Sequence, residues 1–257
     1  MEATRRAAFF DLDRTLIAGA SAFVFARAAR EAGYLTTKDF MRDAAKAVQF
    51  RLSGSTDEMT DAVRDQMLSA VGGRQQSDLV ALNEAVLPEL LGMIRPEARN
   101  LIDQHHAAGR DTYIVSASPI ELVEPLARAL DMTGGIGTVS EVVDGVYTGR
   151  LAGPFCYGDG KAIAISDLAK REGIDLEKSW GYSDSSSDLP MLEIVGHPVA
   201  VNPDTNLARV ARERGWPVVV FSQRTKTVVR RSTAASGAVA IALLAYSLGV
   251  RRGRSIN

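Results

Sequence analysis

Residues 7–16, AAFFDLDRTL, decide the fold of this chain of 257 residues. Four apolar residues end abruptly in a polar stretch, which is typical of a buried parallel strand that breaks into a loop. Asp11 and Asp13 stand two residues apart at this strand end, so one carboxylate could act as a nucleophile while the other moves a proton. Taken alone, the pair is more typical of a solvated strand end or turn.

Further apolar runs along the chain also end in polar residues, and they alternate with helix-like segments. The runs cover residues 112–115, 180–182, 198–201 and 216–221, and the helix-like segments cover 96–108, 120–131, 161–172 and 206–213. This alternation predicts an α/β fold, a Rossmann-like doubly wound parallel sheet with helices on both faces. Ligands of such sheets bind outside the carboxyl ends of the strands, so we expect the polar clusters to converge there.

The stretch 18–92 interrupts this alternation, because it contains amphipathic segments and no convincing strand. The segments cover residues 22–32, 38–51, 56–70 and 77–91. We therefore expect an all-helical cap at 18–92, inserted into an α/β core formed by 1–17 and 93–225, with a tail at 226–257. Residues 141–151 alternate around Asp144 and Gly145, which predicts a small hairpin at the edge of the sheet.

A second carboxylate pair, Asp184 and Asp188, lies in the stretch 182-YSDSSSDLPML-192 at the start of an expected helix. Carboxylate oxygens suit Mg²⁺, which takes one or two of them and completes its coordination with water and substrate phosphate. Asp11 together with Asp184 would be a sufficient contribution from the protein. The alternative is a serine-rich capped loop in which Asp188 is only a charge at a helix N-terminus.

Ser116 and Lys161 also follow predicted breaks in the chain. The Ser116 hydroxyl and the backbone N–H groups after it could hold a phosphate oxygen, or they form a plain turn in which Ser118 caps the next helix. Lys161 opens a helix after a glycine-rich turn, where its ammonium could neutralise a transferring phosphoryl group or simply face solvent. The chain contains no P-loop motif and no serine-hydrolase motif.

Composition limits the classes of protein that remain. The single cysteine, Cys156, excludes an internal disulfide and suits a reducing, cytoplasmic compartment. From residue 222 onward there are seven basic residues and no acidic one, which leaves 23 basic and 31 acidic residues, a formal charge of −8, in the preceding part. The acidic body argues against a nucleic-acid partner, whereas the basic tail suits an anionic membrane surface or an acidic partner.

The four motifs together, at the ends of successive predicted strands, resemble the haloacid dehalogenase-like superfamily of phosphohydrolases. The likeness covers residues 6–221 and includes 199-VAVNPD-204. Within the superfamily, the chain is similar to the phosphoserine-phosphatase-like branch, which carries a helical cap after the first motif. The resemblance implies a Mg²⁺-dependent hydrolase that acts on a small phosphate ester through an aspartyl-phosphate.

The resemblance also implies a role for each motif residue. Asp11 would be the nucleophile, and Asp13 the general acid and base, whose backbone carbonyl also binds Mg²⁺. Asp184 would ligate the metal together with Asp11, and Asp188 would orient the metal's surroundings. The phosphoryl group would be held by Ser116, Ala117 and Lys161.

The chain departs from true phosphoserine phosphatases at positions that bear on the substrate. Arg14 replaces a residue that is usually small, and 18-AGAS-21 lacks the glutamate that meets the substrate ammonium. The stretch 116-SASP-119 replaces Ser-Gly-Gly. Arg51 of the cap is a candidate contact for an anionic substrate group, with a surface helix position as the alternative. Two alternative functions remain: a phosphatase-like regulator of growth or differentiation that acts through a partner, and a membrane-associated lipid-phosphate phosphatase.

The tail contains an uncharged segment, 233–250, bracketed by pairs of arginines. As a helix it would be about 27 Å long at about 1.5 Å per residue, which is just enough to span a bilayer. Three alternatives remain: a membrane span at the inner face of the membrane, a helix lying on the interface, and a helix packed on the body or a partner. The first two would favour a lipid-derived phosphate as substrate.

Overall fold

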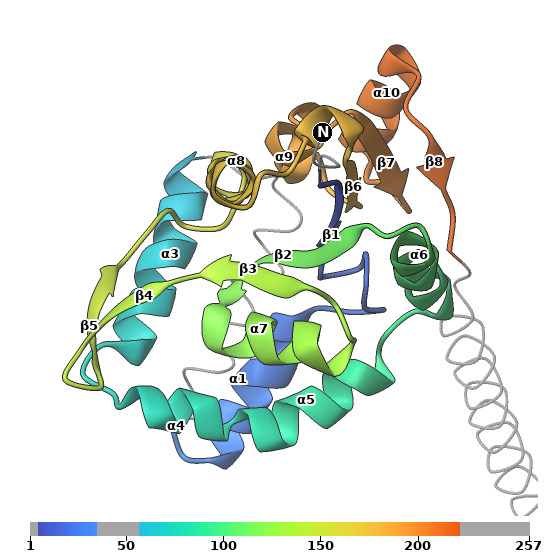
Figure 1. The fold of residues 1–257 in the computed structure, drawn as a ribbon. Coiled ribbons are helices and arrows are strands. Elements are labelled where there is room, and N and C mark those ends of the chain that lie inside the picture. The colour runs from blue at the N-terminus through green and yellow to red at the C-terminus, as the bar shows by residue number, and fades with distance from the viewer. Residues whose placement is uncertain (1–4, 35–56, 222–257) are drawn as a thin grey trace, which may run out of the picture. The chain divides into compact units, whose positions relative to one another are not determined.

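A parallel six-stranded sheet forms the centre of the protein (Figure 1). The computed structural model describes residues 5–34 and 57–221. The strands lie in the order β3-β2-β1-β6-β7-β8, and helices flank the sheet, so the predicted α/β fold is confirmed. The strands of this sheet are β1 (Ala7–Asp11), β2 (Asp111–Pro119), β3 (Gly134–Thr138), β6 (Trp180–Ser183), β7 (His197–Val201) and β8 (Val218–Val219).

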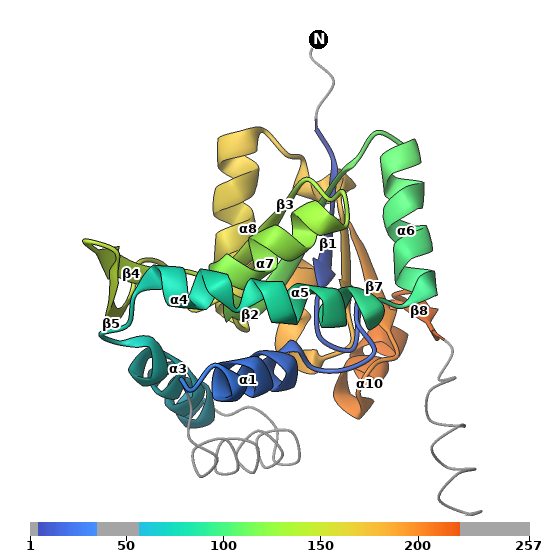
Figure 2. The same ribbon diagram turned by 90° about the horizontal axis from the view of Figure 1, so that it is seen from below.

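The central strand β1 is buried on both faces, as its continuous apolar sequence predicts. Phe9 belongs to an apolar cluster with Ile165 and Leu192, whereas the ring of Phe10 meets His105 edge-on. Figure 2 shows α6 and α8 on opposite sides of the sheet. The helices of this part of the chain are α6 (Pro96–Ala107), α7 (Ile120–Ala129), α8 (Asp159–Glu172), α9 (Leu189–Glu193) and α10 (Thr205–Arg214), with short 3₁₀ turns η1 (Leu176–Lys178) and η2 (Ser186–Asp188).

Local sequence signals explain where these helices begin and end. Pro96 occupies the start of α6, where a missing N–H group costs no hydrogen bond. The carboxylate of Asp204 accepts a hydrogen bond from the N–H group of Leu207 at 2.8 Å and so caps α10. Gly173 and Gly215 end α8 and α10 in the left-handed conformation, with φ of 70° and 69°.

The described helices that follow β1 and precede α6 in sequence gather beyond the carboxyl end of β1 (Figure 2). The predicted helix 77–91 is wrong as a single element, because two helices meet at Leu82. There, Leu82 N–H bonds the carbonyl of Leu79 at 3.2 Å and Ala85 N–H bonds that of Leu82 at 3.1 Å, the tighter spacing of a 3₁₀ turn. The helices are α1 (Ser21–Glu31), α3 (Asp57–Val71), α4 (Gln76–Ala81) and α5 (Asn83–Gly92).

Two predictions fall outside the described residues. They are the helix 38–51 with Arg51, and the segment 233–250. Among the described residues, none of the helices combines the length and the apolar character needed to cross a membrane. The boundaries of the cap and the tail therefore stay predictions.

The edge of the sheet differs from the sequence prediction. The expected hairpin exists as β4 (Ser140–Val143) and β5 (Val146–Leu151), but it forms a sheet of its own instead of extending the central one. One edge strand of the central sheet is β3, which the sequence does not predict because its five residues, GGIGT, form no apolar run. Its glycines let α7 pack directly on the strand, since a Cβ atom on Gly135 would lie 2.9 Å from the backbone of Val123. The predicted last strand, 216–221, is reduced to the two residues of β8.

Candidate active site

The candidate site lies where the sheet reverses its order of strands. From β1 the chain adds β2 and β3 on one side, whereas β6, β7 and β8 follow each other on the other side. In open sheets of this kind, ligands bind at such a point of reversal, outside the carboxyl ends of the strands, here β1 and β6. Phe10 pairs in register with Tyr182, so Asp11, one residue further on, and Asp184, two residues further on, both emerge at this edge of the sheet.

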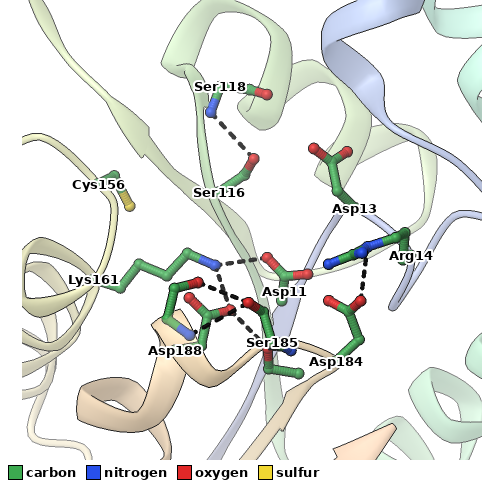
Figure 3. A network of polar contacts seen from close by, with 12 residues as sticks. Asp11, Asp13, Arg14, Ser116, Ser118, Cys156, Lys161, Asp184, Ser185 and Asp188 are labelled. Atoms are coloured by element: carbon green, nitrogen blue, oxygen red, sulfur yellow. Dashed lines mark hydrogen bonds and ion pairs between the residues drawn. The ribbon is translucent and has the colours of Figure 1, made fainter. Parts of the chain in front are cut away.

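Lys161, near the start of α8, contacts both Asp11 at the end of β1 and Asp188 in the loop after β6 (Figure 3). Its Nζ donates to Oδ1 of Asp11 at 2.6 Å and to Oδ2 of Asp188 at 2.8 Å. The Lys161 side chain is only 3% exposed, so the solvent-facing alternative is wrong. Burial opposes its charge, but the two carboxylates outweigh this effect and raise the pKa of Lys161 above its ordinary value. The ammonium is therefore a permanent positive charge inside the site.

The serine-rich loop after β6 holds Asp188 against this lysine. The hydroxyl of Ser183 donates to Oδ2 of Asp188 at 2.7 Å and accepts a hydrogen bond from the N–H group of Ser185. The carboxylate of Asp204 in turn accepts hydrogen bonds from the N–H and the hydroxyl of Ser186. The loop is thus ordered by its own hydrogen bonds, but Asp188 points into the site instead of serving as an exposed helix charge. Sequence reasoning missed Ser183, whose only signal was its place at the strand end.

Asp13 is held by the first helix of the inserted segment. Its Oδ1 accepts a hydrogen bond from the N–H group of Ser21, the first residue of α1, at 2.7 Å. Burial raises the pKa of Asp13, although this hydrogen bond favours the ionised form. The hydroxyl of Ser21 also lies 3.0 Å from that of Ser118, so this serine joins α1 to the loop that follows β2.

Ser116 and Ala117 form the third side of the site. The hydroxyl oxygen of buried Ser116 accepts a hydrogen bond from the N–H group of Ser118 at 3.1 Å, which leaves its proton available to a ligand oxygen. The carbonyl of Ala117 accepts a hydrogen bond from Thr138 at 2.8 Å and is thereby fixed. The alternative in which Ser118 caps the next helix is wrong, because Pro119 is the N-cap of α7 and makes no capping hydrogen bond.

Arg14 brings a second cation to the site, which the sequence analysis treated only as a departure from the family pattern. Its Nε lies 2.7 Å from Oδ2 of Asp184. Burial raises the pKa of Asp184 to about 7, although Arg14 acts to lower it. Burial likewise raises the pKa of Asp11 to about 8, against the opposing effect of Lys161. Both carboxyls therefore need more positive charge than these two side chains supply.

The donor set fits Mg²⁺. In the described part of the chain, the carboxylates of Asp11, Asp13, Asp184 and Asp188 gather around two cationic side chains, Arg14 and Lys161, which favours a further cation (Figure 3). Within residues 5–34 and 57–221 no group of three or more His, Cys, Asp or Glu side chains is arranged so that it could hold a metal ion by itself, so a metal here would rely on fewer carboxylates together with other oxygen ligands. Open sites with few carboxylate oxygens are those that Mg²⁺ occupies with retained water and substrate phosphate.

Comparison with known proteins decides the family. The family model described as haloacid dehalogenase-like hydrolase matches residues 8–193, most of the chain and all of this site. The chain belongs to this family. The resemblance noted from the four motifs is thereby confirmed.

Named relatives support the expected enzyme class, a phosphatase. The hydrolase is 40% identical over 245 residues to the phosphoserine phosphatase SerB1 of Mycobacterium tuberculosis, covering 94% of this chain and 80% of its relative. It is 39% identical over 219 residues to the "inhibition of morphological differentiation protein" of Streptomyces azureus, covering 84% and 79% of the two chains. A crystal structure of a Bordetella pertussis protein of unknown function is similar with a TM-score of 0.74 and 30% identity, covering 84% of this hydrolase and 99% of that chain.

Proposed function

We propose that this hydrolase is a Mg²⁺-dependent phosphomonoesterase that acts through an aspartyl-phosphate on Asp11. The observation that carries the proposal is the contact of Lys161 with both Asp11 and Asp188, at 2.6 and 2.8 Å, at the strand end where Asp13 also emerges. The buried ammonium of Lys161 favours the ionised form of Asp11, although burial opposes it, and compensates the charge that develops on the phosphoryl oxygens. A bound Mg²⁺ would supply the further positive charge that an ionised Asp11 requires.

In the first step, Asp11 attacks phosphorus and the bond between phosphorus and the ester oxygen breaks. Lys161 is bound to Oδ1 of Asp11, which leaves Oδ2 as the attacking atom. Asp13 gives its proton to the leaving alcohol oxygen. Its raised pKa suits this role, because burial favours the protonated acid. Ser116 donates its hydroxyl proton to a phosphoryl oxygen and helps to keep the group in line.

In the second step, water attacks the phosphorus of the aspartyl-phosphate and the bond to Asp11 breaks. Asp13, now ionised, takes a proton from that water, so inorganic phosphate leaves and both carboxyls return to their starting forms. A bound Mg²⁺ would supply compensation for the phosphoryl charge. Asp11, Asp184 and the backbone carbonyl of Asp13 are the groups that would hold it.

As substrate we propose a small phosphorylated metabolite. The name of the mycobacterial relative supports a phosphoserine-like compound. Arg14 and 18-AGAS-21 leave no carboxylate at the place where the ammonium of phosphoserine would be met, which favours other phosphate esters. A lipid-derived phosphate stays the alternative. A panel of phosphorylated metabolites and lipid phosphates, compared by kcat/KM, separates these classes.

The central test is the hydrolysis of an aryl phosphate with and without Mg²⁺ by the wild-type protein and by Asp11→Asn. We expect the variant to lose activity by on the order of 10³-fold or more, because it removes the nucleophile. Asp167→Asn is the matched control, since Asp167 lies on the outer side of α8 with a side chain that is 63% exposed. We also expect acid-quenched wild-type protein to retain phosphate on the peptide that contains Asp11. Full activity of Asp11→Asn would refute the nucleophile assignment.

A second candidate function is regulation through a protein partner. It is favoured by the name of the relative from Streptomyces azureus, which refers to morphological differentiation. In that case the site would serve to bind a phosphorylated ligand without turnover. Saturable partner binding that persists in Asp11→Asn, together with no hydrolysis across the panel, would support this function against the first.

A further inference from the structure

Arg14 is held over Asp184 by the backbone of the loop after β1. Its φ of 64° places it in the left-handed region, which a residue other than glycine adopts only at an energetic cost. The N–H group of Arg14 donates to the carbonyl of Gly19 at 2.9 Å and fixes this conformation. Figure 3 shows the guanidinium between the loop and Asp184, on the side where Asp11 also lies. The conformation therefore aims a positive charge at the two carboxylates that would bind a metal.

The two cations of the site differ in how easily each can leave. Lys161 is 3% exposed and holds two carboxylates, so its departure would leave two buried charges unpaired. The Arg14 side chain is 39% exposed and its ion pair holds only Asp184, whose side chain is 6% exposed. The Arg14 guanidinium can thus be solvated by water when it leaves the ion pair. The buried carboxylate of Asp184 cannot, so the exchange is favourable only when another cation replaces Arg14.

We propose that Arg14 is a displaceable counter-ion that pairs with Asp184 and gives up this carboxylate when Mg²⁺ binds. The inference rests on the proposed function, because it takes Asp184 as a metal ligand. It assigns two effects to one side chain. The guanidinium stabilises the cluster of four carboxylates without metal, and for the same reason it weakens the binding of Mg²⁺.

Isothermal titration of Mg²⁺ into the full-length protein, without substrate, tests the inference. We expect Arg14→Gln to bind Mg²⁺ about fivefold more tightly than the wild type, which corresponds to about 1 kcal/mol at about 1.4 kcal/mol per tenfold. Arg14→Lys keeps the charge and should bind with nearly wild-type affinity. Arg150→Gln is the matched control for net charge, because Arg150 is 71% exposed and pairs with Glu141 on the hairpin.

The direction of the change decides the matter. Unchanged or weaker binding by Arg14→Gln would overturn the inference, since weaker binding would mean that Arg14 orients Asp184 for the metal. Arg14→Lys behaving like Arg14→Gln would also overturn it, because charge would then not be the cause. Absence of Mg²⁺ binding by the wild type would remove the metal from the proposed function as well, so the two failures are distinguishable.

Thermal unfolding gives a second measurement. It compares each protein with and without Mg²⁺, so it stays informative even if the substitution itself lowers stability. The rise in Tm on addition of saturating Mg²⁺ should be larger for Arg14→Gln than for the wild type, because the variant starts without a counter-charge on Asp184. An equal or smaller rise would count against the displacement of Arg14 by metal.

Discussion

His105, on α6 behind the active-site strands, should make the stability of this hydrolase depend on pH. Its imidazole is only 3% exposed. Arg110 lies 3.2 Å from Nδ1, and a guanidinium can only donate, so Nδ1 accepts. The proton of the neutral ring is therefore on Nε2, which lies 2.8 Å from the hydroxyl of Tyr182. A second proton would break the contact with Arg110 and place two cations together. Burial, and then Arg110, lower the pKa of His105 to about 4.

The sign and size of the effect follow from this pKa. The unfolded chain takes up a proton at His105 below about pH 6.5, whereas the folded chain does so only near pH 4. The stabilisation is thus complete at neutral pH and is lost as pH falls through this window. With about 1.4 kcal/mol for each pKa unit, acidification from pH 7 to pH 5 should cost about 2 kcal/mol at this residue.

Urea unfolding of the wild type and His105→Gln at pH 7, 6 and 5 measures this contribution. The other titrating groups are common to both proteins, so the difference between the two free energies of unfolding isolates His105. We expect this difference to shrink by about 2 kcal/mol from pH 7 to pH 5 with unchanged m-values. A difference that stays constant over this range would refute the argument that His105 is buried as the neutral tautomer.

Two further substitutions test the packing and the charges. Gly135→Ala should destabilise the protein by about 1–3 kcal/mol in urea unfolding, because its methyl group would lie 2.9 Å from the backbone of Val123; Gly153→Ala, with nothing within 4 Å, is the control and should change little. Lys161→Met should abolish aryl phosphate hydrolysis and lower stability at pH 7 by about 3 kcal/mol, because two buried carboxylates lose their cation. Lys170→Met, on the same helix and 79% exposed, should leave both properties unchanged, and equal effects of the two lysine variants would contradict the buried role.

The approach of the four motifs to one another could be predicted from the sequence, because the carboxyl ends of parallel strands share one edge of a sheet. Asp11 and Asp184 illustrate this, since their strands pair in register although the residues are far apart in the chain. The apolar runs that precede them are clear signals of buried strands. Strand β3 gives no such signal, because α7 requires glycine where a buried strand ordinarily has a branched residue.

Other features depend on tertiary structure that periodicity does not encode. The direction of Arg14 follows from a left-handed φ, and its pairing with Asp184 follows from two loops that meet only in the folded chain. The burial of Lys161 depends on the approach of α8 to β1 in the folded chain. The general tendency of lysine to face solvent therefore does not predict its position. The hydrogen bond from the N–H group of Ser21 to Asp13 forms only because the chain turns back towards Asp13 at the start of α1.

The central place of β1 has a consequence for how the protein is made. The strand leaves the ribosome long before β6, which begins at Trp180 and pairs with one of its edges. Until β6 is synthesised, the edge of β1 opposite β2 is unpaired. Asp11 likewise has no contact with Lys161 until the chain is 150 residues longer. Such distant pairings make folding slow. Hydrolytic competence therefore arises only when nearly the whole body has been synthesised and closed, and a nascent chain that stops short of β6 exposes an unpaired central strand to its neighbours.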